Sequence, residues 1–260
     1  MVMTVSIKNQ SVRFGFYRNH ACVATFDLAS DIARTADEYA VLLAGGMSLQ
    51  SLDPRACEGA IIASVQPPLT ERVASAINRV CGVIPCEVGP GLKTGLNIKI
   101  ENPAQLGSDL VAMSVGALAQ YKAPLLLVDF EVATTVSAID ENGAFCGVVI
   151  APGVTESLSS LSKHAAKLPE ISLSAPKCVI GKNTVEAMRS GAVYGAASMV
   201  DGLVERMSAE LKAPVTVLAS GKHCGLILEK CKTDIREDQM LVLDGLYEIY
   251  RKNLKGGRKK

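Results

Sequence analysis

An aspartate at the end of an apolar run is the first residue here whose type and setting could support chemistry. Asp129 lies within residues 125–136, which read LLLVDFEVATTV. A continuous apolar run after Pro124 is typical of a strand that is buried on both faces. A carboxylate in such a strand is costly unless it faces a polar cleft or a cation. Two interpretations stay open: Asp129 faces a metal ion or a phosphate, or it caps a neighbouring turn in a core strand.

The segment after Asp129 predicts a hairpin that would position it. Asp140–Gly143 carries an Asn-Gly pair between apolar stretches, which is a strong signal for a tight turn. Ala144–Ile150 is the expected returning strand, and Ala151–Gly153 closes it. Asp129 is therefore expected near the end of a strand that enters an antiparallel pair.

The rest of the chain alternates between strand and helix patterns, with a glycine-rich loop at Gly89–Leu96. Strands are expected at Met3–Ile7, Val12–Tyr17, Ala21–Phe26, Gly59–Val65, Ile84–Val88 and Val215–Ala219. Helices are expected at Thr35–Leu43, Leu69–Val80, Asn102 to about Tyr121, Thr155–Leu168, Val185–Leu211 and Gln239–Lys252. Each half begins with hairpin strands and continues with alternating helices and strands. This repetition predicts two similar α/β domains, residues 1–121 and 122–260, with a cleft between them.

Composition excludes several classes of function. The net charge is +1, aromatic residues make up 4% and tryptophan is absent, so neither nucleic acid nor an anionic membrane is an expected partner. The eight cysteines lack zinc-site spacing, which favours free thiols in a reducing compartment. The sequence shows no signal peptide and no apolar run of membrane-spanning length. A cytoplasmic location is therefore expected.

Five segments together resemble the type III pantothenate kinase family, and the resemblance covers nearly the whole chain. In order, they read GPGLKTGLNIKIENPAQLGSD, LVDFEVATTV, CGVVIAPG, IGKNTVEAMRSGAVYG and DQMLVLDGLYEIYRKN. The resemblance implies two ribonuclease H-like domains of the actin-like ATPase superfamily. It implies phosphoryl transfer from ATP to pantothenate, the first step of coenzyme A synthesis. It also implies Mg²⁺ with the nucleotide, a monovalent cation (K⁺ or NH₄⁺) and a dimer.

The resemblance assigns roles to particular residues. The catalytic base falls on Asp109, since a base must reach the substrate hydroxyl, and the cation-binding acid falls on Asp129. Thr184 would reach the substrate of the neighbouring subunit. Two alternatives remain: Asp109 is an acid favoured by a helix dipole, and Thr184 is a helix N-cap. The positions that match pantothenate contacts are Ile100, Gly107, Ser108, Asp109, Leu110 and Thr184.

The opening motif departs from the family pattern Asp-x-Gly-Asn-Thr. The matching residues are Ser6, Ile7, Lys8, Asn9 and Gln10. Ser6 cannot supply the charge that an acid offers to Mg²⁺. Lys8 stands where glycine would let the backbone approach phosphate oxygens, although its ammonium could itself bind a phosphate.

Departures continue at the other ligand positions. Leu110 replaces an arginine whose fork would bind the pantothenate carboxylate, and Ile100 replaces a tyrosine. Glu131-Val132 replaces Gly-Thr, so an acid stands near the expected polyanion and Val132 lacks the phosphate-facing hydroxyl. Ala219–Gly221 replaces Thr-Gly-Gly. The nucleotide positions are therefore Ser6, Lys8, Asn9, Gln10 and Val132.

Three hypotheses follow. The first is a degenerate family member with little or no activity alone, acting as a homodimer or as a structural subunit of a heterodimer with an intact paralogue. The second is an active pantothenate kinase with altered contacts. The third is a kinase or hydrolase for a less acidic substrate, since Ile100 and Leu110 make that pocket apolar.

Overall fold

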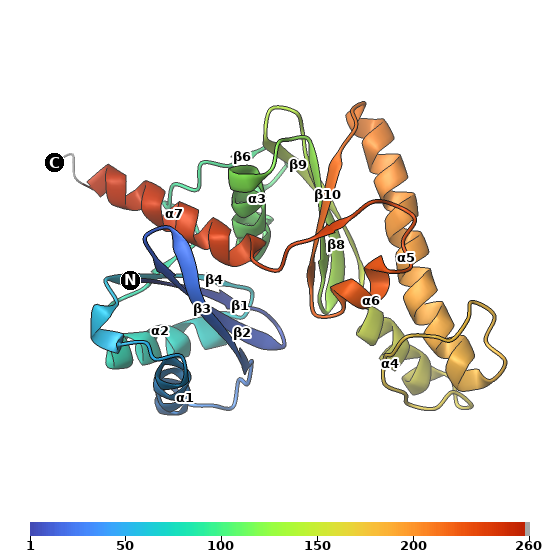
Figure 1. Ribbon diagram of the computed structural model, residues 1–260, viewed down its shortest axis with the longest axis horizontal. Coiled ribbons are helices and arrows are strands. Elements are labelled where there is room, and N and C mark those ends of the chain that lie inside the picture. The colour runs from blue at the N-terminus through green and yellow to red at the C-terminus, as the bar shows by residue number, and fades with distance from the viewer. Residues whose placement is uncertain (258–260) are drawn as a thin grey trace. The chain divides into compact units, whose positions relative to one another are not determined.

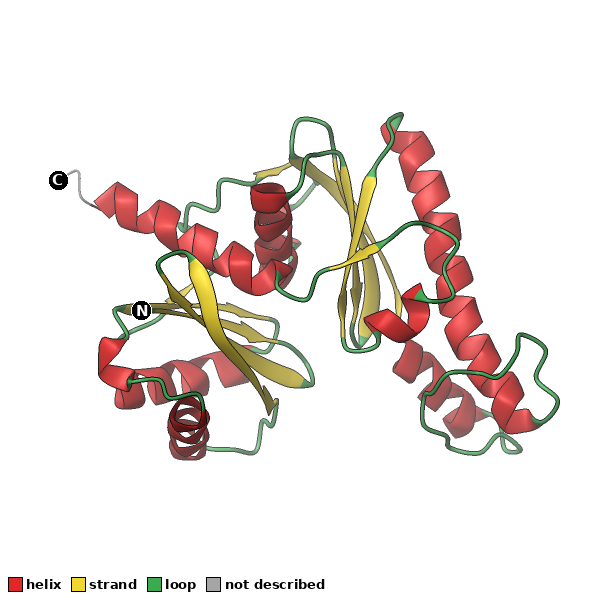
Figure 2. Cartoon of the chain, viewed as in Figure 1, coloured by secondary structure: helices red, strands yellow, loops and turns green. Residues whose placement is uncertain are grey.

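The computed structural model describes residues 1–257, with side chains as far as residue 254. The chain forms two compact units, each built around one sheet (Figures 1 and 2). Unit 1 comprises Met1–Leu96, Glu101–Gln120 and the chain from Met240 onward, and unit 2 comprises Asn97–Ile100 and Tyr121–Gln239. A single boundary after residue 121 therefore does not describe the units, because the last helix packs in unit 1.

Unit 1 contains a five-stranded sheet in the order β3-β2-β1-β4-β5. Its strands are β1 (Val2–Ile7), β2 (Ser11–Arg18), β3 (Ala21–Ala29), β4 (Gly59–Ser64) and β5 (Cys86–Glu87). The first three strands pair antiparallel, whereas β4 lies parallel to β1 and to β5. The C-terminal ends of β1, β4 and β5 therefore lie at one edge of this sheet.

Helices cover both faces of the first sheet (Figure 1). They are α1 (Ala36–Leu49), α2 (Pro67–Cys81), α3 (Ser108–Gln120) and α7 (Leu241–Gly257), with short 3-10 turns η1 (Pro54–Ala56) and η2 (Pro103–Gln105). Met3, Val5 and Ile7 join α1 and α2 in one apolar core. Because side chains alternate along a strand, Thr4 and Ser6 point to the other face, where Leu243 of α7 lies close to Gly15 and Thr4.

Unit 2 contains a six-stranded sheet in the order β11-β10-β7-β8-β9-β6. The strands are β6 (Asn97–Ile98), β7 (Leu125–Phe130), β8 (Ala133–Ile139), β9 (Ala144–Pro152), β10 (Thr216–Gly221) and β11 (Arg236–Glu237). Its helices are α4 (Val154–His164), α5 (Thr184–Leu211) and α6 (Cys224–Leu228). Leu126, Val128 and Phe130 of β7 pack with α5 and α6. Among residues 1–257, no helix has the length and apolar character of a membrane span.

Most expected elements are present, with differences at their ends. Thr35 caps α1 through a capping box with Glu38, and the helix continues past Leu43 to Leu49. The helix expected from Asn102 is broken: η2 ends at Gln105, and α3 begins at Ser108. The hairpin at Asp140–Gly143 is confirmed, with the Asp140 carboxylate accepting hydrogen bonds from the N–H groups of Asn142 and Ala144.

Candidate active site

The edge of the first sheet where β1 and β4 end carries the opening motif. Ile7 pairs with Ser64 in parallel register, and the N–H of Val65 donates to the carbonyl of Ile7 at 3.0 Å. The Lys8–Gln10 turn thus leaves the sheet at the same edge as Gln66, whose Nε2 lies 3.1 Å from Asn9 Oδ1. Ligands of α/β proteins commonly bind outside the C-terminal ends of parallel strands.

The opening motif presents no carboxylate at this edge. Ser6 is 3% exposed, and its hydroxyl has no hydrogen-bond partner among the described residues. In the turn that follows, the N–H of Lys8 donates to Ser11 O at 2.8 Å, and its carbonyl accepts from Ser30 Oγ at 2.6 Å. Both backbone groups of Lys8 are therefore already hydrogen-bonded within the protein.

The Gly107–Leu110 motif lies at the start of α3, beside β4. Ser108 Oγ accepts a hydrogen bond from Ser64 N at 2.9 Å and donates one to Ser64 O at 3.0 Å. Asp109 is half-buried in the first helical turn, and a Cβ on Gly107 would collide with its carboxylate. Leu110 is half-buried and apolar. Unit 1 therefore gathers Ser6, the Lys8–Gln10 turn and Asp109 at one sheet edge.

Asp129 lies at the end of β7 among hydroxyl side chains. It is 5% exposed and pairs in register with Thr135 on β8 and Ser220 on β10. Thr135 and Ser137 lie on the same face of the sheet as Asp129, and their buried hydroxyls have no hydrogen-bond partner among the described residues. One carboxylate among hydroxyl oxygens is a donor set that suits a hard cation.

The Glu131-Val132 turn joins β7 to β8, next to two glycines. The N–H of Gly153 donates to Val132 O at 2.9 Å, and a Cβ on Gly153 would collide with this turn. Gly221 has a φ of 114° and lies against the Phe130 backbone. Both close approaches require glycine. The half-buried Glu131 and Val132 thus stand beside the end of β10 in unit 2.

The remaining predicted substrate positions lie in unit 2. Ile100 is half-buried and follows β6, where Lys99 N donates to Phe145 O at 2.8 Å. Thr184 is exposed and is the first residue of α5. The N-cap interpretation of Thr184 is wrong, because Asn183 caps the helix by accepting from Glu186 N at 2.9 Å. A shallow groove of about 570 Å³ contains Thr184 between α4 and α5.

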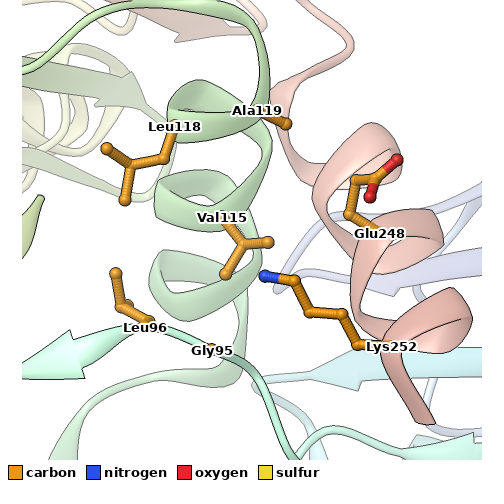
Figure 3. A pocket seen from close by; sticks show the side chains of 7 residues that line it. All are labelled: Gly95, Leu96, Val115, Leu118, Ala119, Glu248 and Lys252. Atoms are coloured by element: carbon orange, nitrogen blue, oxygen red, sulfur yellow. The ribbon is translucent and has the colours of Figure 1, made fainter. Parts of the chain in front are cut away.

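A separate pocket of about 330 Å³ lies beside the glycine-rich loop (Figure 3). It is lined by Gly95, Leu96, Val115, Leu118, Ala119, Glu248 and Lys252. Lys252 Nζ donates to Thr94 O at 3.1 Å, and the Asn253 amide makes two hydrogen bonds with the Lys93 backbone. The loop is thus fastened to α7, and none of the predicted ligand positions lines the pocket.

Three residues that support the candidate site through hydrogen bonds were not predicted from the sequence. Ser64 fixes Ser108, Gln66 holds Asn9, and Gln239 bonds both backbone groups of Gly221. The available signal was the change from apolar to polar residues at the end of a buried strand, where Ser64 ends β4 and Gln66 follows it. Gln239 had none, because its partner is eighteen residues distant in sequence.

The model of the type III pantothenate kinase family matches residues 2–206. The chain belongs to this family. A type III pantothenate kinase from an Exiguobacterium species is 39% identical over 98% of this chain and 100% of the relative. Another, from Moorella thermoacetica, is 38% identical over 97% of this chain and 100% of the relative. The family resemblance inferred from the sequence is confirmed.

Solved structures agree on the fold. A protein assigned to the Baf family of transcriptional activators, from Campylobacter jejuni, has a TM-score of 0.61 at 17% identity, with 97% of this chain and 99% of that chain covered. A protein assigned as a 2-dehydro-3-deoxygalactonokinase, from Sinorhizobium meliloti, has a TM-score of 0.62 at 12% identity and the same coverage. This type III pantothenate kinase family member therefore has the expected α/β, ribonuclease H-like architecture.

Proposed function

We propose that this chain is a degenerate type III pantothenate kinase with weak or no activity alone. Its role is that of a structural subunit in a dimer. The observation that carries the proposal is Ser6: a buried serine occupies the position of the family's Mg²⁺-binding acid, at the sheet edge that also carries Asp109. Phosphoryl transfer depends on a metal ion to neutralise the charge that develops on the phosphates. Serine leaves that ion without its anionic ligand.

Nucleotide binding is weakened on both units. In unit 1, Lys8 adds a side chain where the family uses glycine, and its N–H is already bonded to Ser11. In unit 2, Glu131 adds a carboxylate at the β7–β8 turn. A carboxylate about 4 Å from one phosphate charge costs roughly 4 kcal/mol at an effective dielectric of about 20. The donors present do not fit MgATP.

Pantothenate recognition is weakened as well. Leu110 offers no donor to a carboxylate where the family has arginine, and Ile100 replaces the tyrosine. Two half-buried apolar residues at these positions favour an uncharged ligand over an acid. An active kinase with altered contacts, or a kinase for an uncharged alcohol, would each require ATP to bind.

The cation position retains suitable chemistry. Asp129 would hold K⁺ or NH₄⁺, with the hydroxyls of Thr135 and Ser220 flanking it in register. Such a cation would supply positive charge at the end of β7. The residues around Asp129 are retained, whereas serine replaces the acid that would bind Mg²⁺. This combination fits a chain that keeps the family's fold and has lost its catalytic activity.

Assembly gives the chain a role without a working site of its own. Thr184 is exposed at the start of α5, and the segment before this helix carries the exposed apolar side chains of Val179 and Ile180. In the proposed heterodimer, an intact paralogue provides the nucleotide loop, and this chain donates Thr184 to its substrate site. A homodimer with two inactive sites is the alternative form.

Titration calorimetry with MgATP tests the proposal most directly. The expected result is weak binding or none, and a dissociation constant in the micromolar range would contradict the proposal and favour the alternatives that require ATP to bind. Circular dichroism and the unfolding transition of the same sample show that the protein is folded.

A further inference from the structure

The pocket beside the glycine-rich loop combines an apolar wall with two opposite charges (Figure 3). Val115 of α3 is 4% exposed, and Leu96 and Leu118 beside it are half-buried. Glu248 and Lys252 of α7 line the same pocket. All five residues belong to unit 1, so one compact unit builds the whole pocket.

The two charges of the pocket are not paired with each other. Glu248 and Lys252 stand four residues apart on α7, in the order that normally forms an ion pair on a helix. Among the described side chains, however, Glu248 Oε1 accepts from Arg251 Nη1 at 2.9 Å, and Lys252 Nζ donates to Thr94 O at 3.1 Å. An ammonium has three donors and a carboxylate has two acceptor oxygens. Both groups therefore retain capacity to bind a ligand.

The glycine-rich loop fixes the lysine at the pocket. A Cβ on Gly95 would lie 2.6 Å from Lys252 Nζ, so the bare glycine, at a φ of 76°, leaves room for the ammonium. Figure 3 shows the lysine reaching from α7 toward Val115 of α3. The Asn253 amide also holds the Lys93 backbone. The pocket is thus formed before any ligand arrives, which lowers the cost of binding.

We propose that this pocket binds an aliphatic α-amino acid of about the size of leucine. The carboxylate of the ligand bonds Lys252, and its ammonium bonds Glu248. Its side chain packs against Leu96, Val115 and Leu118. The site goes beyond the proposed function, because none of the nucleotide, pantothenate or cation positions lines it.

Other classes of ligand match the pocket less well. A fatty acid would bring its carboxylate close to Glu248, and a simple amine would bring its ammonium close to Lys252, so each meets a like charge. A nucleotide would find no aromatic ring among the described lining residues on which to stack its base. The volume of about 330 Å³ lies at the small end of ligand pockets, which suits one amino acid.

Titration calorimetry of the full chain with L-leucine, without nucleotide, tests the proposal. We expect saturable binding of one leucine. Isocaproate is leucine without its ammonium, and isoamylamine is leucine without its carboxylate. Each should bind about tenfold more weakly, because one hydrogen bond to a charged group is lost. Methyl NMR spectra should shift at Leu96, Val115 and Leu118, whereas Val128 of β7 should not change.

Two variants assign the charges. Lys252→Gln should weaken leucine binding about tenfold and remove the preference for leucine over isoamylamine. Glu248→Gln should weaken leucine binding by a similar factor and remove the preference for leucine over isocaproate. Lys122→Gln and Glu205→Gln change exposed residues outside the pocket. As matched controls, they should leave leucine binding unchanged.

Three results would overturn the proposal: no leucine binding at millimolar concentrations, equal binding of the three ligands, or methyl shifts confined to residues outside the pocket. The wild-type ligand series decides the question even if a variant fails to fold. Because these measurements need neither ATP nor pantothenate, their outcome is independent of the outcome for the proposed function.

Discussion

The hydroxyl of Ser108 bonds both backbone groups of Ser64, accepting from its N–H and donating to its carbonyl. The first turn of α3 is thereby tied to the end of β4. Asp109, the next residue, takes its position from the sheet rather than from the loop that precedes it. The residue proposed as the catalytic base thus sits in a helical turn that β4 holds in place.

Ser108→Ala tests this tie. Two half-buried backbone groups of Ser64 would lose their partner, and an unsatisfied polar group costs about 1–3 kcal/mol. Urea unfolding should show a loss of this size in the free energy of unfolding. Ser172→Ala changes an exposed loop serine and should shift stability by less than about 0.5 kcal/mol. Equal effects of the two substitutions would show that the Ser108 bonds carry no stability.

Restoring the family's ligand residues should recover nucleotide binding. The restored variant combines Ser6→Asp, Lys8→Gly, Gln10→Thr, Glu131→Gly and Val132→Thr. Calorimetry should detect MgATP binding to this variant and little or none to the parent. A folded variant that stays inert would place the cause of inactivity elsewhere. If it phosphorylates pantothenate, Asp109→Asn should lower its rate by about 10²- to 10⁴-fold, as expected for a positioned general base.

Thr184 tests the proposed heterodimer. The chain should co-purify with an intact paralogue, and Thr184→Val should lower the pantothenate kinase activity of the mixed complex without dissociating it. Thr216→Val, at the exposed start of β10, is the control and should leave activity unchanged. Failure of the mixed complex to form, or full activity of Thr184→Val in it, would contradict the donated-threonine hypothesis.

Gly245 lies where α7 meets α3. A Cβ on Gly245 would collide with the carbonyl of Ala112, and one on Gly116 would collide with that of Leu241. Gly245→Ala should therefore destabilise unit 1, although alanine normally favours a helix over glycine by about 1 kcal/mol. Gly45→Ala, with open space around it in α1, should stabilise by about 0.5–1 kcal/mol. Thermal unfolding of both variants should show shifts of opposite sign.

The family, the α/β class and the hairpin after β7 could be predicted from the sequence, because apolar runs and an Asn-Gly turn are local signals. The position of Asp129 at the end of a buried strand followed from the same pattern. The capping of α1 by Thr35 was also readable, since a threonine followed three residues later by glutamate is a local motif.

The supporting contacts could not be predicted. Ser64 and Ser108 are forty-four residues apart. No local sequence pattern indicates that the Ser108 hydroxyl will bond the Ser64 backbone. The break before α3 was missed, because Asn102 and Pro103 signal a helix start but not its early end at Gln105.

The placement of α7 in unit 1 has a consequence for synthesis of the chain. Residues 1–120 emerge from the ribosome first and contain all five strands of the first sheet. Helix α7, which packs in the same unit, emerges after unit 2. The face of the first sheet that α7 covers therefore remains uncovered while the whole of unit 2 is translated. A nascent chain stalled before residue 240 would carry a complete unit 2 and an unfinished unit 1, so the part made first is the part completed last.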